Sequence, residues 1–226
     1  MNQTIKIKIC GMRHPENIAA VAVLRPDYLG FIFHPGSSRY VGAKPPLELF
    51  SSLPDTIGRI GVFVDEDPHQ LRALCRQYGF FAAQLHGRET PAQCRLIREN
   101  GLQVIKAFAL DEQFDFRQLE AYAETVNYFL FDTRGSLPGG TGRKFNWQLL
   151  ERYRLAVPFF LSGGIGPADA PALLALQHPQ FYAADVNSSF EQAPALKNVC
   201  RLKPFIRALR HKERNSSGSP PQETTG

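Results

Sequence analysis

Ile5-Lys6-Ile7-Lys8-Ile9-Cys10-Gly11 is a β-branched stretch that predicts a β-strand ending on a thiol. Seven further runs of β-branched or aromatic residues follow it, at residues 28–33, 59–64, 81–87, 103–110, 128–133, 158–164 and 182–187. Several of these runs are apolar on both faces, as in Phe129-Leu130-Phe131, which is expected of strands covered on both sides. The spacing of about 25 residues from strand to strand is typical of a repeated unit of strand, loop, helix and loop.

Helix-start signals lie between the predicted strands. Proline falls near the expected first turn at Pro15, Pro68, Pro91 and Pro167, where its missing N–H group has little cost. Eight such units in 226 residues predict an α/β protein, a single-domain (β/α)8 TIM barrel over residues 1–210, rather than an open doubly wound sheet. Residues 211–226 contain almost no apolar side chains, so we expect a disordered C-terminal tail there.

The composition argues against several classes of protein. No apolar run approaches the roughly 18 residues of a membrane-spanning helix, and the N-terminus lacks a signal-peptide pattern. The four cysteines are widely separated and no Cys/His cluster has zinc-site spacing, so we expect neither disulfides nor a metal. The net charge of +5 is spread along the chain, and an anionic metabolite accounts for it as well as nucleic acid does. We therefore expect a cytoplasmic protein with no membrane or nucleic-acid partner.

Two reactive side chains fall at strand ends, where barrels carry out their chemistry. Cys10 ends the first predicted strand and Asp132 ends the sixth, three strands away by the shorter path around the ring. That separation favours a general base and a general acid on two sides of one substrate, rather than a nucleophile with an adjacent activator. An alternative stays open for each residue. Cys10 could serve only as a small buried apolar side chain, and Asp132 could only cap the following helix or pair with Arg134.

Two glycine- and serine-rich segments follow the seventh and eighth predicted strands. They are Ser162-Gly163-Gly164-Ile165-Gly166 and Asn187-Ser188-Ser189-Phe190-Glu191, at the place where barrels often bind phosphate through backbone N–H groups. Glycine permits the close backbone approach and the positive φ that such a site requires. A third segment, Gly139-Gly140-Thr141-Gly142, follows the sixth strand and could add donors or cover the site. Taken singly, each segment is also compatible with a tight turn.

Other polar residues near strand ends are candidates for substrate contacts. Arg39 lies in a loop of small residues and suits a bidentate contact with a carboxylate, although a solvated loop charge fits equally well. Gln84 and His86 are two apart on a strand and share a face, so they either line the barrel mouth or form a buried polar layer. Lys8 and Lys106 point either inward or outward. The predicted substrate-binding set is Arg39, Gln84, His86, Gly140, Gly142, Ser162, Gly163, Gly164, Asp185, Asn187, Ser188 and Ser189.

Taken in order, these segments resemble the phosphoribosylanthranilate isomerase family of tryptophan biosynthesis. The resemblance runs from about residue 5 to residue 210. It rests on Lys8-Ile9-Cys10-Gly11-Met12, Gly30-Phe31-Ile32-Phe33, Ser37-Ser38-Arg39-Tyr40-Val41, Gly61-Val62-Phe63-Val64, Gln84-Leu85-His86-Gly87, Phe131-Asp132-Thr133, Gly139-Gly140-Thr141-Gly142, Leu161-Ser162-Gly163-Gly164-Ile165 and Asp185-Val186-Asn187-Ser188-Ser189-Phe190-Glu191.

The resemblance implies a cofactor-free Amadori rearrangement of N-(5-phosphoribosyl)anthranilate in a monomer or homodimer. It implies that Asp132 is the general acid for the ribose ring oxygen and that Cys10 is the general base for the C2′ proton. Arg39 would hold the anthranilate carboxylate, and the loops after the sixth to eighth strands would hold the phosphate. The chain departs from the family where Ser189 replaces a common glycine and Asn187-Ser188 replaces a more frequent double serine, so the detail of the phosphate site stays open.

Three other functions fit the pattern less well. Indole-glycerol-phosphate synthase would need a catalytic lysine and glutamate at strand ends, and ribulose-phosphate epimerase would need metal-binding histidines. Neither arrangement is evident in the sequence. A non-catalytic barrel that binds RNA or another anion is supported only by the basic isoelectric point. We therefore expect an isomerase acting on a small phosphosugar.

Overall fold

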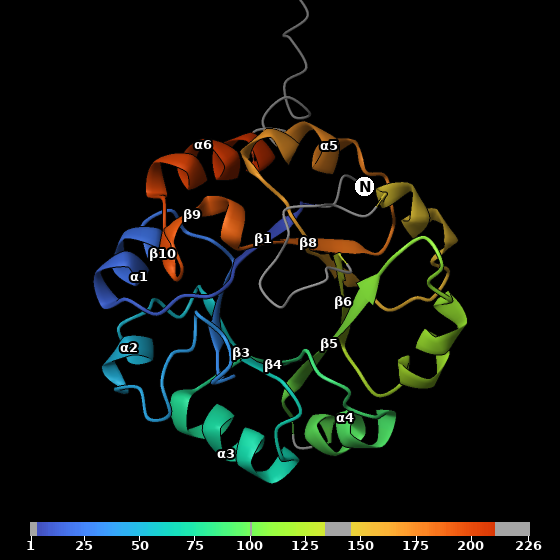
Figure 1. Ribbon diagram of the computed structural model, residues 1–226, viewed down its shortest axis with the longest axis horizontal. Helices are drawn as coiled ribbons and strands as arrows, with labels where there is room; N and C mark the ends of the chain where they lie inside the picture. The colour runs from blue at the N-terminus through green and yellow to red at the C-terminus, as the bar shows by residue number, and fades with distance from the viewer. Residues whose placement is uncertain (1–3, 100, 134–145, 211–226) are drawn as a thin grey trace, which may run out of the picture.

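Eight parallel strands close into a ring in the computed structural model, which describes residues 4–99, 101–133 and 146–210. Each strand pairs with the next along the chain, and the eighth pairs with the first. The helices lie outside this ring, as Figure 1 shows. The strands are β1 (Lys6–Ile9), β2 (Tyr28–Ile32), β3 (Gly58–Phe63), β4 (Ala82–Leu85), β5 (Gln103–Leu110), β6 (Tyr128–Thr133), β7 (Phe159–Leu161) and β8 (Phe181–Val186). The predicted (β/α)8 barrel is confirmed.

The predicted proline positions begin the outer helices. Pro15, Pro68 and Pro91 lie in the first turn of α1, α3 and α4, and Pro167 begins the 3-10 turn η3 (Pro167–Asp169) that leads into α5. Proline is favoured there because the first N–H groups of a helix have no acceptor within it. The α-helices are α1 (Pro15–Ala22), α2 (Glu48–Ser51), α3 (Pro68–Tyr78), α4 (Pro91–Arg98), α5 (Ala170–Ala175) and α6 (Val199–Arg210).

Three connections differ from the predicted unit of strand and α-helix. The segments that follow β5 and β6 contain 3-10 helices, η1 (Phe116–Tyr122) and η2 (Trp147–Arg152). After β8, the 3-10 turn η4 (Ser188–Phe190) leads into a hairpin of β9 (Glu191–Ala193) and β10 (Leu196–Lys197). The hairpin strands are three and two residues long, which is too short to produce a recognisable alternation in the sequence.

Side chains alternate along the strands between the helix layer and the inside of the barrel. Ile7 and Ile9 of β1 belong to the outer apolar core, so Lys8 between them points inward. The inner side near the beginning of the strands is filled by an apolar cluster of Tyr28, Ile60, Ala82, Ile105, Ala107, Leu130, Phe160 and Ala183. Farther along, the buried inward side chains are polar, with Lys8, Gln84 and Asp185 among them. The barrel is therefore closed by apolar packing at one end and is polar at the other.

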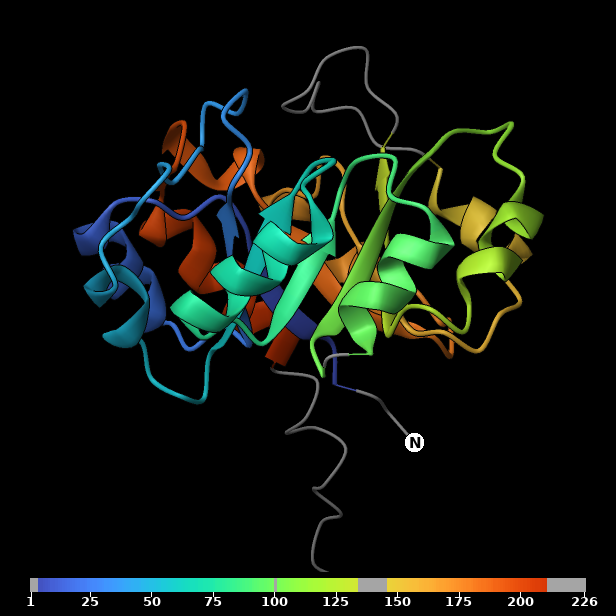
Figure 2. The same ribbon diagram turned by 90° about the horizontal axis from the view of Figure 1, so that it is seen from below.

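The polar end is the one formed by the carboxyl ends of the strands. In Figure 2 the chain enters β1 from below, so the carboxyl ends face the top of the view. Cys10 follows β1 and Asp132 lies at the end of β6, so both belong to this upper end. The predicted tail, residues 211–226, lies outside the described residues. None of the helices in the described ranges is long and apolar enough to cross a membrane.

Truncation after Arg210 should leave thermal stability unchanged, because Leu209, the last buried side chain of α6, is retained. Truncation after Lys203 is the matched control. It removes Phe205 and Ile206 from the core as well, and each large buried side chain contributes about 2–5 kcal/mol. Scanning calorimetry would compare both variants with the full chain. A melting temperature lowered by more than about 3 °C in the first variant would contradict the prediction, since that corresponds to most of a kcal/mol.

Candidate active site

A buried ion pair joins the first strand to the last at the polar end of the barrel. Lys8 and Asp185 are register partners on β1 and β8, and the Lys8 Nζ lies 2.9 Å from the Asp185 Oδ2. Both side chains are almost fully buried, so each offsets part of the other's desolvation cost. Burial alone would lower the pKa of Lys8, but Asp185 and Cys10 together raise it above its ordinary value. Lys8 is therefore an ammonium group at neutral pH, inside the barrel.

Cys10 lies next to this pair. Its backbone N–H donates to the Val186 carbonyl at 2.9 Å, continuing the β1–β8 ladder, and the residue is only 5% exposed. Burial raises the pKa of the thiol, while Lys8 acts to lower it, Asp185 to raise it and Lys197 to lower it. The thiol therefore lies among charged groups, of which the two lysines favour its ionisation and the carboxylate opposes it.

The other buried cysteines have fewer charges around them: one lysine, Lys106, and one carboxylate, Glu89, act on the Cys94 thiol, and no charged group shifts the pKa of Cys75. Burial raises the pKa of both Cys75 and Cys94 to about 12, and at Cys75 burial is the only cause. All four cysteines are free thiols, and Cys200 is exposed. Among the described residues, no group of three or more His, Cys, Asp and Glu side chains is arranged to hold a metal ion. Cys10 is therefore chemically distinct from the other buried thiols of the chain.

Asp132 presents a partly exposed carboxyl group at the end of β6. Its Oδ1 accepts a hydrogen bond from the backbone N–H of Thr133 at 2.8 Å, and its Oδ2 lies 3.5 Å from the His86 Nε2. The next helical turn, η2, is capped by Asn146, so Asp132 is not its cap. Arg134, the other alternative partner, lies outside the described residues. The Asp132 side chain is 30% exposed, which leaves it accessible to a bound molecule.

Gln84 and His86 interact on one face of the chain, as their spacing predicted. The Gln84 amide nitrogen lies 3.0 Å from the His86 Nδ1. An amide nitrogen only donates, so Nδ1 is the acceptor, and Nε2 is the ring nitrogen that faces Asp132. Gln84 is buried, whereas the His86 side chain is 37% exposed. Gln84 thus belongs to the buried polar layer and His86 to the barrel mouth.

Asp185 connects the two predicted catalytic side chains. Its carboxylate interacts electrostatically with Cys10 and with Asp132, although their strands are three steps apart around the ring. Burial raises the pKa of Asp185, and Lys8 acts in the opposite direction. Its Oδ1 is buried and has no hydrogen-bond partner among the residues that the structure describes. The structure therefore brings Cys10, Asp132 and Asp185 into one charged cluster.

Arg39 is 7% exposed and is held by Glu191, so it is not a solvated loop charge. Its Nε donates to Oε1 at 2.9 Å and its Nη2 to Oε2 at 2.6 Å. Glu191 also accepts from the Lys197 Nζ at 2.5 Å. Burial acts to raise the pKa of Glu191, but these hydrogen bonds from Arg39 and Lys197 hold it below its ordinary value. Sequence analysis named Glu191 only as the end of the segment after the eighth strand and missed its pairing with Arg39, because no pattern links residues 152 positions apart. It did not single out Lys197.

Gly11 makes room for the Arg39 side chain. Its φ is +75°, in the left-handed region that favours glycine. A Cβ at this position would lie 2.6 Å from the Arg39 Cδ and 2.8 Å from the Asn187 Oδ1. The glycine after Cys10 is therefore required both by its backbone conformation and by the two side chains that cross it.

The loops that follow β7 and β8 lie side by side. Gly163 and Gly164 adopt φ values of +90° and +69°, and a Cβ on Gly163 would lie 2.5 Å from the Thr133 nitrogen. A Cβ on Gly166 would lie 3.6 Å from that of Ser189. The other predicted phosphate contacts in this region are Ser162 after β7, Asn187 after β8 and Ser188 in η4, whereas Gly140 and Gly142 lie outside the described residues.

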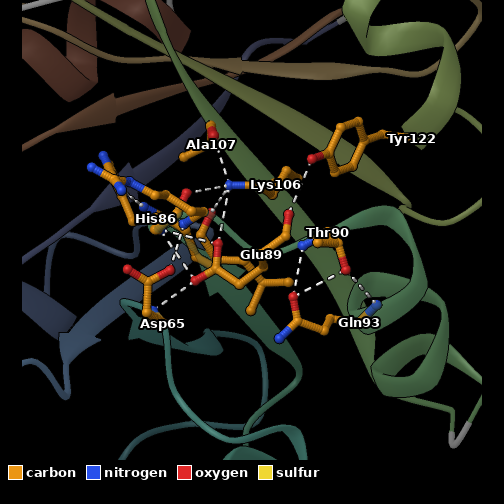
Figure 3. A network of polar contacts seen from close by, with 12 residues as sticks. Asp65, His86, Glu89, Thr90, Gln93, Lys106, Ala107 and Tyr122 are labelled. Atoms are coloured by element: carbon orange, nitrogen blue, oxygen red, sulfur yellow. Dashed lines mark hydrogen bonds and ion pairs between the residues drawn. The ribbon is translucent and has the colours of Figure 1, made fainter.

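Lys106 has a structural environment that differs from that of Lys8. Its inward neighbours on β5 belong to the inner cluster, so Lys106 itself lies on the helix-facing side. Its Nζ lies 3.0 Å from the Glu89 Oε2 and donates to the backbone carbonyls of Leu85, Gly87 and Ala107. Glu89 also accepts from the N–H groups of Asp65 and Gly87. Figure 3 shows this network around the segment that carries His86, which it holds in place.

Comparison with known proteins gives one consistent result. A family model described as N-(5'phosphoribosyl)anthranilate (PRA) isomerase matches residues 7–208. The N-(5'-phosphoribosyl)anthranilate isomerase of Phocaeicola vulgatus is 45% identical over 206 residues, which is 91% of this chain and 98% of that protein. Its sequence aligns with this chain along almost its full length.

Two solved structures show the same agreement. One is a phosphoribosyl anthranilate isomerase in complex with reduced 1-(o-carboxyphenylamino)-1-deoxyribulose 5-phosphate, with a TM-score of 0.78 at 30% identity, covering 92% of this chain and 99% of that one. The other shows monomers generated from the dimeric isomerase of Thermotoga maritima, with a TM-score of 0.74 at 30% identity, covering 91% and 98%. With the family model matching nearly all of the barrel, this chain belongs to the N-(5'-phosphoribosyl)anthranilate isomerase family.

Proposed function

We propose that the polar end of the barrel converts N-(5-phosphoribosyl)anthranilate into 1-(2-carboxyphenylamino)-1-deoxyribulose 5-phosphate by general acid–base catalysis, with Asp132 as the acid and Cys10 as the base. The observation that carries the proposal is one charged cluster containing a carboxyl group and a thiol that come from strands three steps apart. This separation suits a reaction that protonates one side of a sugar and removes a proton elsewhere. The family membership of the chain supports the choice of substrate.

The acid step opens the ribose ring. Asp132 gives its proton to the ring oxygen, the C1′–O4′ bond breaks, and the anthranilate nitrogen lone pair forms a C1′=N double bond. The exposed part of the Asp132 carboxyl group is available to the sugar, while the Thr133 N–H group fixes its orientation. The His86 Nε2–H group, 3.5 Å away, is placed to stabilise the carboxylate that remains after the proton has left.

The base step moves hydrogen away from C2′. The Cys10 thiolate forms an S–H bond with the C2′ hydrogen, the C2′–H electron pair becomes a C1′=C2′ double bond, and the C1′=N electrons return to nitrogen. The resulting enolamine tautomerises to the 2-ketone. Because burial raises the pKa of the Cys10 thiol, the thiolate depends on the positive charges around it.

Arg39 would bind the anthranilate carboxylate. Glu191 occupies the Nε and Nη2 side of its guanidinium group, which fixes the plane of the group. The Nη1 side is the one that Glu191 does not occupy, and a carboxylate can approach it along the same plane. In this arrangement Glu191 holds the arginine in position and the substrate carboxylate contacts its other side.

The phosphate would bind between the loops that follow β7 and β8. Backbone N–H groups near Gly163, Gly164 and the 3-10 turn η4 are the proposed donors, and the positive φ values of the two glycines favour a concave backbone. The proximity of Gly166 to Ser189 supports a single site formed by both loops. Gly140 and Gly142 remain proposed contacts.

The expected partners follow from this chemistry. A small phosphosugar requires no cofactor for an internal proton transfer, and it accounts for the basic charge of the chain without nucleic acid. The dimeric form described for the Thermotoga maritima isomerase supports our expectation of a monomer or homodimer. We also expect a cytoplasmic location for this biosynthetic step.

Replacing Cys10 with alanine, or Asp132 with asparagine, should lower kcat by about 10²–10⁴-fold, which is the usual contribution of one general acid or base. Binding of reduced 1-(o-carboxyphenylamino)-1-deoxyribulose 5-phosphate, an analogue of the product, should change little, since neither side chain is needed to hold its charged groups. The rate is measured by the loss of fluorescence of freshly generated phosphoribosylanthranilate.

Matched controls distinguish a catalytic role from a loss of folding. Cys94→Ala removes another buried thiol, and Asp115→Asn removes an exposed carboxylate that caps η1. Both variants should keep a kcat within about threefold of the unmodified chain, as expected for side chains outside the reaction. A Cys10→Ala variant with an unchanged kcat would refute the role of the thiol as base.

Arg39→Ala should raise KM by about 10–100-fold, because a hydrogen bond to a charged group contributes about 1.5–3 kcal/mol. Arg39→Lys should give an intermediate KM, since lysine keeps the charge but not the planar pair of donors. Arg117→Ala, which removes an exposed arginine beside Asp115, is the control and should leave KM unchanged. Steady-state kinetics would separate the two parameters, and a lower kcat with an unchanged KM in Arg39→Ala would contradict the binding role.

A further inference from the structure

We propose that Lys8 is a positioning residue for the base: its buried ammonium group, held by Asp185, supports the negative charge on Cys10 when the thiol removes the C2′ proton. This inference rests on the proposed role of Cys10. It assigns a function to a lysine whose direction the sequence left open. It also gives β8 a part in the site, because Asp185 of β8 holds Lys8 in place.

Geometry places the ammonium group beside the thiol. Lys8 and Cys10 are two residues apart on β1 and its continuation, so their side chains lie on the same inward face. Both occupy the space that Gly30 of β2 leaves empty: a Cβ there would lie 2.8 Å from the Cys10 Sγ and 3.1 Å from the Lys8 Cε. The strand next to β1 therefore has no side chain at the position where the two groups meet.

The hydrogen bonds of Lys8 leave donor capacity for the thiol. An ammonium group has three N–H donors. One Lys8 donor goes to the Asp185 Oδ2 at 2.9 Å, and the neighbouring Cys10 thiol acts to raise the pKa of Lys8. By contrast, the three backbone carbonyls and the Glu89 carboxylate around Lys106 use all of its donors, and the buried Cys94 thiol interacts with it only electrostatically. Of these two buried lysines, only Lys8 keeps donor capacity for a neighbouring thiol.

The charges around Cys10 act in opposite directions. Lys8 faces the thiol from β1, Asp185 from β8 and Lys197 from β10. The two lysines favour the thiolate, whereas the Asp185 carboxylate disfavours it. Removing Lys8 should therefore raise the pKa of Cys10, and neutralising Asp185 should lower it. A purely structural role for the ion pair predicts no such opposition, because loss of either partner would loosen the same contact.

The test measures the pH midpoint for alkylation of Cys10 by iodoacetamide, with the modified Cys10 peptide resolved by mass spectrometry. Lys8→Met should move the midpoint upward by about 1–3 pH units, the usual effect of losing an adjacent opposite charge. Asp185→Asn keeps an oxygen that accepts from Lys8 and should move the midpoint downward. The acid limb of the kcat/KM profile should move in the same direction as the alkylation midpoint in each variant.

Further variants control for folding. Lys106→Met removes another buried, paired lysine and should lower stability without moving the Cys10 midpoint. Lys8→Arg keeps the positive charge and should stay closer to the unmodified midpoint than Lys8→Met does. If Lys8→Met does not fold, the Asp185→Asn variant and the double variant Lys8→Met/Asp185→Asn, which leaves no unpaired buried charge, provide the comparison.

The outcomes separate this inference from the proposed function. Opposite shifts in Lys8→Met and Asp185→Asn support Lys8 as the residue that maintains the base. An unchanged midpoint in Lys8→Met, or shifts of the same sign in both variants, would overturn the inference even if Cys10→Ala is inactive. Full activity of Cys10→Ala would instead overturn the proposed function, and the alkylation midpoints would still show whether Lys8 controls the ionisation of the thiol.

Discussion

The ion pair between Lys8 and Asp185 lies across the seam where the barrel closes, because β1 and β8 are the first and last strands of the ring. The pair is formed only when these strands align with Lys8 opposite Asp185. A shift by one residue would turn Lys8 toward the helices and leave the buried carboxylate without its partner. The strand register that closes the barrel therefore also brings Lys8 and Asp185 together at the reactive end.

The buried cations divide into groups with different tasks, and each has a carboxylate partner. Lys106 and Glu89 fix the backbone next to His86. Glu191 joins Arg39 and Lys197, which connects the short β9–β10 hairpin to the loop after β2. Pairing keeps each group charged inside a protein, where an isolated charge is very costly. At the opposite end of the barrel the interior is filled by aromatic and aliphatic side chains, so the charges are confined to one end.

The sequence predicted what depends on local pattern and missed what depends on register. All eight strands and the proline-started helices follow from periodicity and from helix-start chemistry, and Cys10 and Asp132 became catalytic candidates because they lie at strand ends. The pairing of Arg39 with Glu191 has no local signal, because it joins residues 152 positions apart. The inward direction of Lys8 was ambiguous for a related reason: alternation gives two faces, and only the closed ring shows which face is the interior.

The charges facing Cys10 also explain why a thiol suits this position. Lys8 is paired with Asp185, whereas Arg39 and Lys197 share a single carboxylate, Glu191. Glu191 offsets only one of the two positive charges that it binds, and a thiolate on Cys10, which Lys197 faces, would offset the other. A carboxylate at the position of Cys10 would balance the positive charge permanently, but it would also repel the neighbouring Asp185 carboxylate permanently. A thiol carries charge only while it acts as base and returns to a neutral group once it holds the substrate proton, so the cluster tolerates both states.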